Sequence, residues 1–392
     1  MKWQWLWVVP ALVAAGYGQT ESAITREGGS WVQTLTSVIP LEGTARLRVS
    51  THGALKLQGE DRGDVAYTLN KRVWVATESS ARQLLARMGV KGGRQGGWTT
   101  LAASFPSDSR AASNTSADLS LQVPRKLLEV ELGSEGGAVE AFDLEGTLKA
   151  ETGGGRIHID RIKGELTIRT GGGEVLLGRI GRAVHCASGG GSITADYIGG
   201  EAGFSTGGGD ISVGEALGPV RASTSGGNIR IGRAGGPVTA ATGSGLVEVS
   251  QAGGLVAAES GAGSIKVRLA QGCRCESSTG SIQLHYVFGP LRAATGMGSI
   301  IAELVAGKPL EDSMLSTGSG DITVFIPSNL AVTIQAISDS PGLQRIISDF
   351  PEIQARVYSR AGRAEAQGAL NGGGPVLKLA ASDGTIYLRR QK

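Results

Sequence analysis

The chain has 392 residues, of which 63 are glycine, and its 38 Lys and Arg nearly balance its 35 Asp and Glu. A formal net charge of +3 does not indicate a nucleic acid or another polyanion as partner. Three cysteines in a chain of this length do not make a disulfide framework, so a buried core must hold the fold.

Residues 1–18 have the pattern of a secretory leader. Lys2 precedes an apolar run from Trp3 to Ala15, and small residues follow the run. The run is too short to span a bilayer, and no later apolar stretch is long enough. We therefore predict an exported protein of the periplasm, the cell surface or the medium, without a transmembrane span. The alternative for this run is a buried hydrophobic strand.

Residues 19–128 are predicted to form a β-rich N-terminal cap with one short helix. The helix is expected at residues 79–89, with Ser79 or Ser80 as its N-cap and Gly89 at its end. The segment 47–57 already has the pattern of a repeat, with Gly53 two residues before Leu55. We expect this region to cover the strand edges of the first repeat, which would otherwise be unpaired.

Residues 129–327 repeat one short phrase. Each repeat is numbered here from its Ile or Val, which is position 0. These residues are Val139, Ile157, Val175, Ile193, Ile211, Ile229, Val247, Ile265, Ile282, Ile300 and Ile322. The first seven steps are 18 residues long, and the last three are 17, 18 and 22. A fixed period of this size predicts a stacked architecture, in which each repeat buries its apolar side chains against its neighbours.

A glycine stands at position −2 of every repeat. The column is Gly137, Gly155, Gly173, Gly191, Gly209, Gly227, Gly245, Gly263, Gly280, Gly298 and Gly320. Two physical reasons can select glycine so regularly. The backbone there has a positive φ, or stacked turns approach too closely to leave room for a Cβ.

A serine or threonine stands at position −5 of every repeat. The column is Ser134, Thr152, Thr170, Ser188, Thr206, Thr224, Thr242, Ser260, Ser277, Thr295 and Thr317. Position +2 is apolar, and positions −9 and −7 are mostly apolar, which indicates two short strands per repeat. The sequence therefore predicts an all-β parallel β-solenoid with 18-residue rungs, two short strands per rung and about four buried side chains per rung. Stacked hydroxyls at the bend can bond one another or bend carbonyls; an outward, ice-binding threonine array is the less favoured alternative.

Residues 328–392 are predicted to form a C-terminal cap and a final rung. The period lapses after Pro327, and a segment around Phe350 is expected to fold over the side or end of the stack. The rung pattern returns near the C-terminus, where Gly384 lies two residues before Ile386.

Several phrases together resemble one known family. They are the leader, Leu55–Gly59, the helix expected at 79–89, Val123–Arg125, Thr206–Ile211, Ile347–Pro351 and the glycines at 372–374. The chain resembles a bacterial family of exported β-solenoid domains labelled "putative adhesins", of unknown function. The likeness covers nearly the whole chain after the leader. It implies a solenoid in the cell envelope and contact with a surface, and it supplies no catalytic or binding residue.

The sequence predicts no cofactor and no metal site. A calcium β-roll needs an Asp at position −1 of every turn, and this column contains Arg156 and Leu246. The four histidines fall in different columns or distant repeats, so zinc ligands do not converge. Cys186, Cys273 and Cys275 are expected to be small buried residues, and a strained bridge between the last two is the alternative.

The expected function is a non-catalytic scaffold or adhesin-like contact surface of the cell envelope. Its partner is an unknown envelope or surface component, a glycan among the candidates, and a homo-oligomer stays open. Outward acids such as Glu259 and Glu276 are scattered among Ser, Ala and Arg, which is typical of a solvated face. The rival is a carbohydrate-binding or carbohydrate-acting solenoid. Its site would lie near the first rungs, at His158, Asp160, Arg161 and Arg179, although the last three are more typical of a salt-bridged bend.

Overall fold

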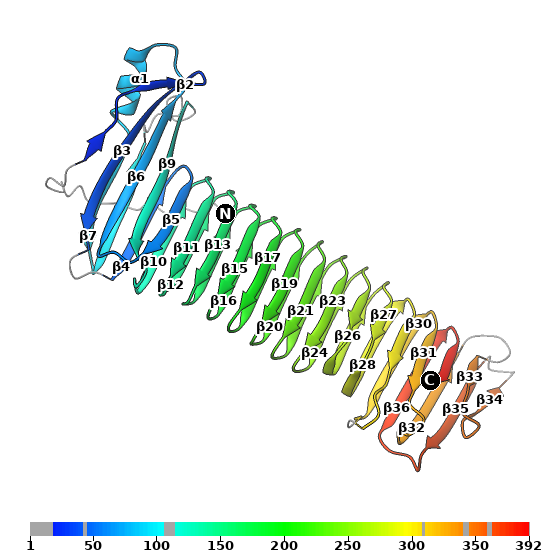
Figure 1. Ribbon diagram of the computed structural model, residues 1–392. Helices are drawn as coiled ribbons and strands as arrows, with labels where there is room; N and C mark the ends of the chain where they lie inside the picture. Colours follow the sequence, from blue (N-terminus) through cyan, green and yellow to red (C-terminus); the bar gives the residue numbers. More distant parts are fainter. Residues whose placement is uncertain are drawn as a thin grey trace. The chain divides into compact units, whose positions relative to one another are not determined.

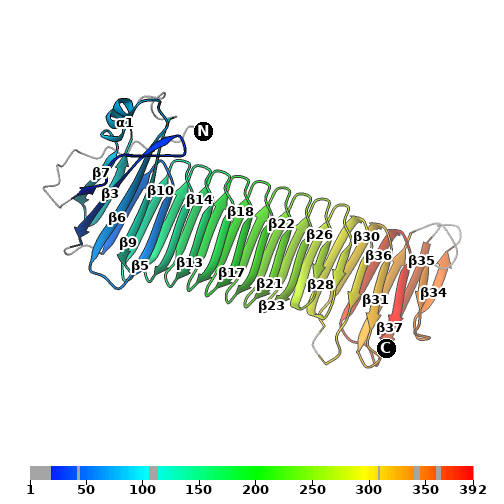
Figure 2. The same cartoon turned by 45° about the horizontal axis from the view of Figure 1, so that its top comes forward.

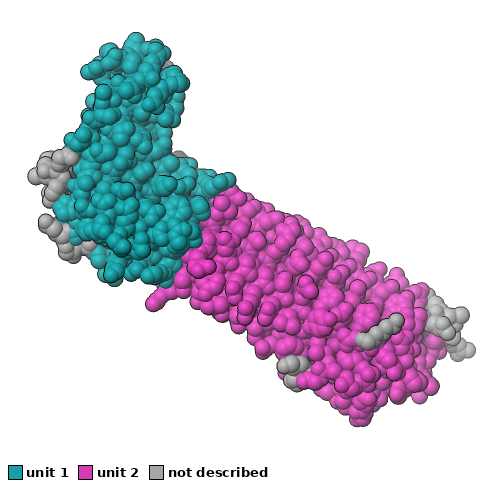
Figure 3. All heavy atoms as spheres, in the orientation of Figure 1, with its two compact units in different colours: residues 1–171 teal, residues 172–392 magenta. Residues whose placement is uncertain are grey.

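The computed structural model describes residues 19–41, 45–105, 114–307, 310–339, 345–358 and 363–391. The expected leader at 1–18 lies outside these residues. The chain is an all-β parallel solenoid with rungs of about 18 residues, built from two sheets, and antiparallel strands cap it (Figure 1). It divides into two compact units, unit 1 up to Gly171 and unit 2 from Gly172 onward (Figure 3). The boundary between the two units falls inside the repeat region. The domain boundaries expected at 128 and 327 therefore stay predictions.

One strand of each rung belongs to sheet A and the other to sheet B. The first bend, which contains the glycine at position −2, leads from sheet B to sheet A, and the second bend leads back to sheet B. Strands of neighbouring rungs pair in parallel and in register, so that Ile211 lies beside Ile229 and Thr206 beside Thr224. Identical positions therefore form straight columns along each unit.

Unit 1 contains the N-terminal cap and the first rungs. Its sheet A has, in spatial order, β3 (Ser30–Pro40), β6 (Asp64–Val73), β9 (Thr115–Pro124), β5 (Leu55–Glu60), β11 (Val139–Leu144) and β13 (Ile157–Ile162), with β1 (Thr20–Glu21) and β2 (Thr25–Glu27) on the outer edge of β3. Its sheet B has β7 (Gly89–Gln95), β8 (Trp98–Ser104), β4 (Arg46–Thr51), β10 (Glu129–Ser134), β12 (Thr147–Thr152) and β14 (Leu166–Thr170).

The cap is stacked out of sequence order. Strands β4 and β5 form the rung that the segment 47–57 predicted, and β8 and β9 form a further rung outside it. Helix α1 (Glu78–Leu85) lies against β6 and β3. The expected N-cap at Ser79 or Ser80 is wrong, because Thr77 has an extended backbone and its Oγ1 accepts from the N–H of Ser80 at 3.3 Å. No helix in the described part of the chain has the length and apolar composition that a membrane crossing requires.

Unit 2 continues the same rung and ends in the C-terminal cap. Its sheet A has β15 (Val175–Ile180), β17 (Ile193–Ile198), β19 (Ile211–Ala216), β21 (Ile229–Ala234), β23 (Val247–Ala252), β25 (Ile265–Val267), β27 (Ile282–Leu284), β29 (Ile300–Glu303), β31 (Ile322–Ile326), β37 (Ile386–Arg390) and β33 (Ile346–Ser348). Its sheet B has β16 (Val184–Ser188), β18 (Ala202–Thr206), β20 (Val220–Thr224), β22 (Val238–Thr242), β24 (Val256–Ser260), β26 (Ala270–Ser277), β28 (Val287–Met297), β30 (Ser313–Ser319), β36 (Val376–Asp383), β32 (Val332–Ser338), β35 (Arg363–Leu370) and β34 (Gln354–Tyr358). Figure 2 shows the bends of this unit aligned in a row on each edge.

The C-terminal strands return to the stack as predicted. β36 and β37 pair in parallel with β30 and β31 and form the final rung. The intervening segment then lies beyond that rung, where β32 and β33 pair with it and β35 and β34 close sheet B in antiparallel orientation. The segment therefore covers the last rung, and its buried Phe350 belongs to this cover.

Six side chains of each regular rung point inward, at positions 0, +2 and +5 of sheet A and −9, −7 and −5 of sheet B. The column at +5 is buried and was not predicted. It consists of Leu144, Ile162, Ile180, Ile198, Ala216, Ala234, Ala252 and Ala270. A period of two cannot place it, because the chain makes an irregular step after position +3. In unit 1 the step is visible at Asp143 and Arg161, whose φ values are 61° and 56°.

Candidate functional site

The hydroxyl at position −5 joins two stacked rungs. Thr224 Oγ1 donates to the carbonyl oxygen of Gly209 in the preceding rung at 3.0 Å and accepts from the N–H of Gly227 in its own bend at 3.2 Å. Thr224 is only 6% exposed, so these bonds satisfy polar groups that water reaches poorly. The same donation to a glycine carbonyl is made by Ser134, Thr152, Ser188, Thr206, Thr242, Ser260, Ser277, Thr295, Thr317 and Ser338. Thr170 is buried in the same column.

Close approach explains the glycine column at position −2. A Cβ on Gly209 would lie 2.4 Å from the carbonyl oxygen of Gly191, and a Cβ on Gly227 would lie 2.0 Å from that of Gly209. Gly155 meets the bend before it at the same short range. Gly155, Gly209 and Gly227 have no positive φ, whereas Gly298 and Gly320, in the last two rungs of the column, combine the close approach with φ values of 150° and 135°. Gly173 is buried in this column, and its carbonyl accepts from Ser188 Oγ at 3.5 Å.

The residues at position 0 form the centre of the core. Ile157, in unit 1, and Val175, Ile193, Ile211 and Ile229, in unit 2, are fully buried. Together with the glycines and hydroxyls they build each rung.

Side chains at position −1 bond to the backbone of the next rung. Asp210 Oδ1 accepts from the N–H of Asn228 at 2.7 Å, and Asn228 Oδ1 accepts from the N–H of Leu246 at 2.9 Å. The bond from the Asn228 N–H is the main reason why the pKa of Asp210 lies below its usual range. These oxygens thus hold the first bends together. Within the described residues, no three His, Cys, Asp or Glu side chains gather as metal ligands.

The candidate cluster at the first rungs is a salt-bridged bend with a partner that the sequence analysis missed. Arg161 Nε and Nη2 donate to the two carboxylate oxygens of Asp143 at 2.8 Å each, and Arg161 also bonds Asp160. The hydrogen bonds from Arg161 lower the pKa of Asp143 to about 2. His158 packs edge-on against Phe142, with 5.1 Å between ring centroids.

The fourth member of that cluster, Arg179, belongs to unit 2. Its guanidinium lies over the Tyr197 ring, 5.7 Å from the ring centroid. Ion pairing and ring contacts therefore occupy these side chains; Arg161 and Arg179 are exposed, and His158 and Asp160 are half-buried. A catalytic acid or base needs a free group that faces a substrate pocket.

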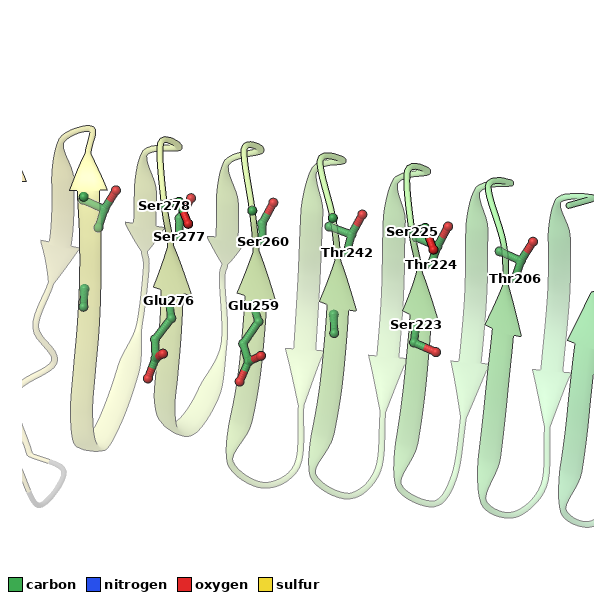
Figure 4. A pocket seen from close by; sticks show the side chains of 16 residues that line it. Thr206, Ser223, Thr224, Ser225, Thr242, Glu259, Ser260, Glu276, Ser277 and Ser278 are labelled. Carbon is green, nitrogen blue, oxygen red and sulfur yellow. The ribbon is translucent and has the colours of Figure 1, made fainter. Parts of the chain in front are cut away.

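The outer face of sheet B in unit 2 carries a shallow groove of about 900 Å³ (Figure 4). It runs across β18 to β28. At position −6 its rungs carry the short side chains of Ser223, Ala241 and Ala294 and the longer ones of Glu259 and Glu276. The hydroxyl column borders the groove on the side of the first bends.

Two carboxylates lie side by side in this groove. Glu259 and Glu276 are paired in register on β24 and β26, and Figure 4 shows them pointing the same way. Both are exposed, and Glu276 Oε1 accepts from Arg274 Nε at 2.9 Å. The sequence analysis treated these acids as scattered. The signal was present in the repeat, because both residues occupy position −6 of successive rungs.

A smaller hollow of about 280 Å³ lies on the outer face of sheet B in unit 1. Ser50, Ala102 and Gly133 are among its short lining residues. The charged residues around it pair with one another, as Arg48 does with Glu131 at 2.6 Å and Lys149 with Glu129 at 2.6 Å.

The three cysteines are free and buried, as predicted. Burial raises the pKa of the Cys186 thiol to about 12. A hydrogen bond that the Cys275 thiol makes to Cys273, with burial second, holds the pKa of Cys275 well above its usual range. Neither feature favours a nucleophilic thiolate.

No family model matches this sequence, and no curated protein matches it. Five chains of solved structures match, and three of them are the following. A putative cell adhesion protein from Clostridium sporogenes is 10% identical with a TM-score of 0.21, and the match covers 92% of this chain and 100% of that one. A putative adhesin from Bacteroides fragilis is 14% identical with a TM-score of 0.27, and the match covers 69% of this chain and 96% of that one. A putative lipid binding protein from Parabacteroides distasonis is 12% identical with a TM-score of 0.26, and the match covers 75% of this chain and 97% of that one. Two of these three structures are described as a putative cell adhesion protein and a putative adhesin.

Proposed function

We propose that this protein is a non-catalytic solenoid of the cell envelope that presents an extended contact surface, in the manner of an adhesin. The groove on the outer face of sheet B supports this proposal best. It is open and continuous over successive rungs, and its lining combines short side chains such as Ser223, Ala241 and Ala294 with Glu259 and Glu276. Such a surface suits an elongated ligand, because equivalent contacts repeat at the strand spacing of about 4.8 Å.

The distribution of chemistry within the rung also supports a structural role. The columns at 0, +2, +5, −9 and −7 supply the core, and the column at −5 closes the bends through hydrogen bonds. Glu259 and Glu276 are exposed in an open groove, and one of them is paired with an arginine. Carboxyl pairs that hydrolyse glycosides keep one member in a desolvated environment.

The proposal is tested by filling the groove. Ala241→Trp places a large ring at position −6, in the middle of the lining. The matched control is Ser212→Trp, a half-buried residue on the outer face of sheet A in the same unit. Pull-down of the mature protein with envelope fractions and purified glycans is the measurement. We expect the groove variant to bind about tenfold more weakly and the control to bind as the wild type does. Equal binding by both variants would exclude the groove as the contact surface.

Binding or cleavage of a linear glycan is the second candidate function. The adjacent carboxylates Glu259 and Glu276, beside a row of hydroxyl groups, are the observation that favours it. The test is to incubate the wild type and the variant E259Q/E276Q with soluble polysaccharides and to measure new reducing ends and unsaturated products. Turnover by the wild type that the double variant lacks would show that the non-catalytic proposal is wrong.

A further inference from the structure

One exposed apolar residue occurs in each of five successive second bends of unit 2. These residues are Leu217, Pro237, Leu255, Leu269 and Tyr286, and we call them the apolar ridge. Leu217 is 51% exposed and Tyr286 53%. Single exposed apolar side chains are ordinary on a protein surface, whereas a row of them along one edge marks an interaction site.

The opposite edge of the same five rungs has a different composition. The first bends at 207–210, 225–228, 243–246, 261–264 and 278–281 contain Gly, Ser, Thr, Ala, Asp and Asn, and Leu246 is their one larger apolar residue. The two edges of unit 2 are built on the same backbone repeat. The apolar ridge is therefore a property of one edge only.

The ridge is packed and locally strained. Leu269 and Tyr286 occupy the same column of adjacent rungs, since Val267 pairs with Leu284 two residues before them. Leu255 and Pro290 close around Gly272, where an added Cβ would lie 3.1 Å from a side-chain atom of each. Tyr286 has a φ of 52°, a conformation that an aromatic residue adopts at a cost. Position 286 is +4 of its rung, the place of the irregular step that also gives Asp143 and Arg161 a positive φ.

Arginines lie in the second bends and in the strand ends beside them. The segments 214–221, 232–239, 250–257, 268–274 and 285–292 contain five arginines and one acidic residue, Glu215. Arg233 pairs with Glu215, Arg221 with Glu201 and Arg274 with Glu276, while His285 pairs with Glu303. Arg268 and Arg292 form no ion pair within the described part of the chain. The ridge thus has beside it two arginines, Arg268 in a second bend and Arg292 in β28, whose charge no ion pair of the described residues offsets.

We infer that the apolar ridge docks this protein on the surface of an anionic lipid bilayer. The inference rests on the proposed function as an envelope contact protein and names one contact face and its partner. The ridge residues stand at bends that are aligned in a row, so a planar surface can meet all five rungs at once (Figure 2). Leucine side chains suit the boundary of the acyl chains, and the arginines suit anionic headgroups. Tyr286 fits the same interface, where aromatic rings with a polar end gather.

The test uses vesicles of phosphatidylcholine with phosphatidylglycerol, vesicles of phosphatidylcholine alone, and the mature protein. The ridge variant is L255D/Y286D, in which Asp accepts the left-handed backbone at position 286. The matched control is L246D/M297D, which adds the same charge and removes apolar side chains at first bends. We expect the wild type to sediment with the anionic vesicles and to be released by high salt. The ridge variant should bind about tenfold more weakly, and the control should bind as the wild type does.

Three results would overturn the inference. The first is a wild type that does not sediment with anionic vesicles. The second is an equal loss of binding by the ridge and control variants. The third is a ridge variant that changes the mass measured by light scattering and leaves vesicle binding unchanged, which would identify a second copy as the partner. The groove test separates these results from a failure of the proposed function. Envelope binding that persists without vesicle binding contradicts the ridge inference alone, and a wild type that binds no envelope fraction contradicts the proposed function.

Discussion

At position −2 the backbones of two stacked first bends come so close that no side chain fits between them. A Cβ on Gly209 would lie 2.5 Å from the amide nitrogen of Ser192, nearer than atoms in van der Waals contact. The next glycine toward the tip, Gly208, has open space around the position of its Cβ. Two adjacent glycines of one bend therefore have different reasons to be glycine.

This contrast gives a prediction at one bend. Gly209→Ala should lower the free energy of unfolding by about 1–3 kcal/mol, because the new methyl group must displace the backbone of the preceding rung. Gly208→Ala should change it by less than about 1 kcal/mol, and in the stabilising direction if the backbone tolerates alanine. Urea denaturation of the two variants measures the difference. Equal losses would mean that close approach does not select glycine at position −2.

The ion pair of Asp143 and Arg161 should appear in the acid stability of the protein. The folded-state pKa of Asp143, about 2, lies below the ordinary value of about 3.9, so the pair stabilises the fold above pH 4 and this contribution is lost as the pH falls toward 2. Asp143→Asn should cost about 1 kcal/mol at pH 7, since Arg161 is half exposed and solvent screens the pair. The difference from the wild type should shrink between pH 4 and pH 2. Asp196→Asn, at an exposed carboxylate, is the control, and a constant difference across this range would contradict the assignment.

At the scale of the bend, the hydroxyl column decides whether two buried backbone groups have partners. Thr224→Val keeps the shape of the side chain and leaves the Gly209 carbonyl and the Gly227 N–H without it. We expect a loss of about 1–3 kcal/mol for each group left unsatisfied. Thr224→Ser should be nearly neutral, because serine fills the same position at Ser188, Ser260 and Ser277. Thermal unfolding of both variants tests this, and similar melting temperatures for Val and Ser would contradict it.

The regular elements could be predicted because the period is strict. From Ile157 onward, position 0 and its neighbours alternate inward and outward, and one shift by a residue would reverse the whole pattern. The column at +5 could not be predicted, because the step after +3 changes the phase of the strand. Helix α1 shows a similar limit, since the choice of Thr77 over Ser79 as N-cap depends on the backbone that precedes the helix. Local sequence alone does not determine that backbone.

At the scale of the whole molecule, less of the candidate site than of the core could be predicted. The register that places Glu259 beside Glu276 follows from the period, yet the depth of the groove depends on how the short side chains at −6 combine across rungs. Asp143 was missed as the partner of Arg161 although both occupy position +4 of successive rungs, because at the irregular step the alternation of the strand does not tell where a side chain points. The apolar ridge mixes positions +4, +6 and +8, so no single column shows it in the sequence.

The repeat also makes the whole stack modular, which leads to a prediction about deletions. Removing residues 207–224 joins Thr206 to Ser225, so that positions −5 and −4 stay adjacent and every column continues. Because each inner rung pairs with its two neighbours, the shortened protein should fold and lose only about one rung and one interface of stability. Removing 207–215 should unfold the protein, since the end of a sheet B strand at Thr206 would then be joined to the end of a sheet A strand at Ala216.

The same deletions test the groove. If the groove is a distributed contact surface, deletion of 207–224 should weaken envelope binding in proportion to the lost length. Deletion of 189–206, at the end of the groove, should weaken it less. Circular dichroism and the same pull-down measure both effects. Complete loss on removing one rung from a protein that still folds, with no loss elsewhere, would show a single local site and contradict the scaffold.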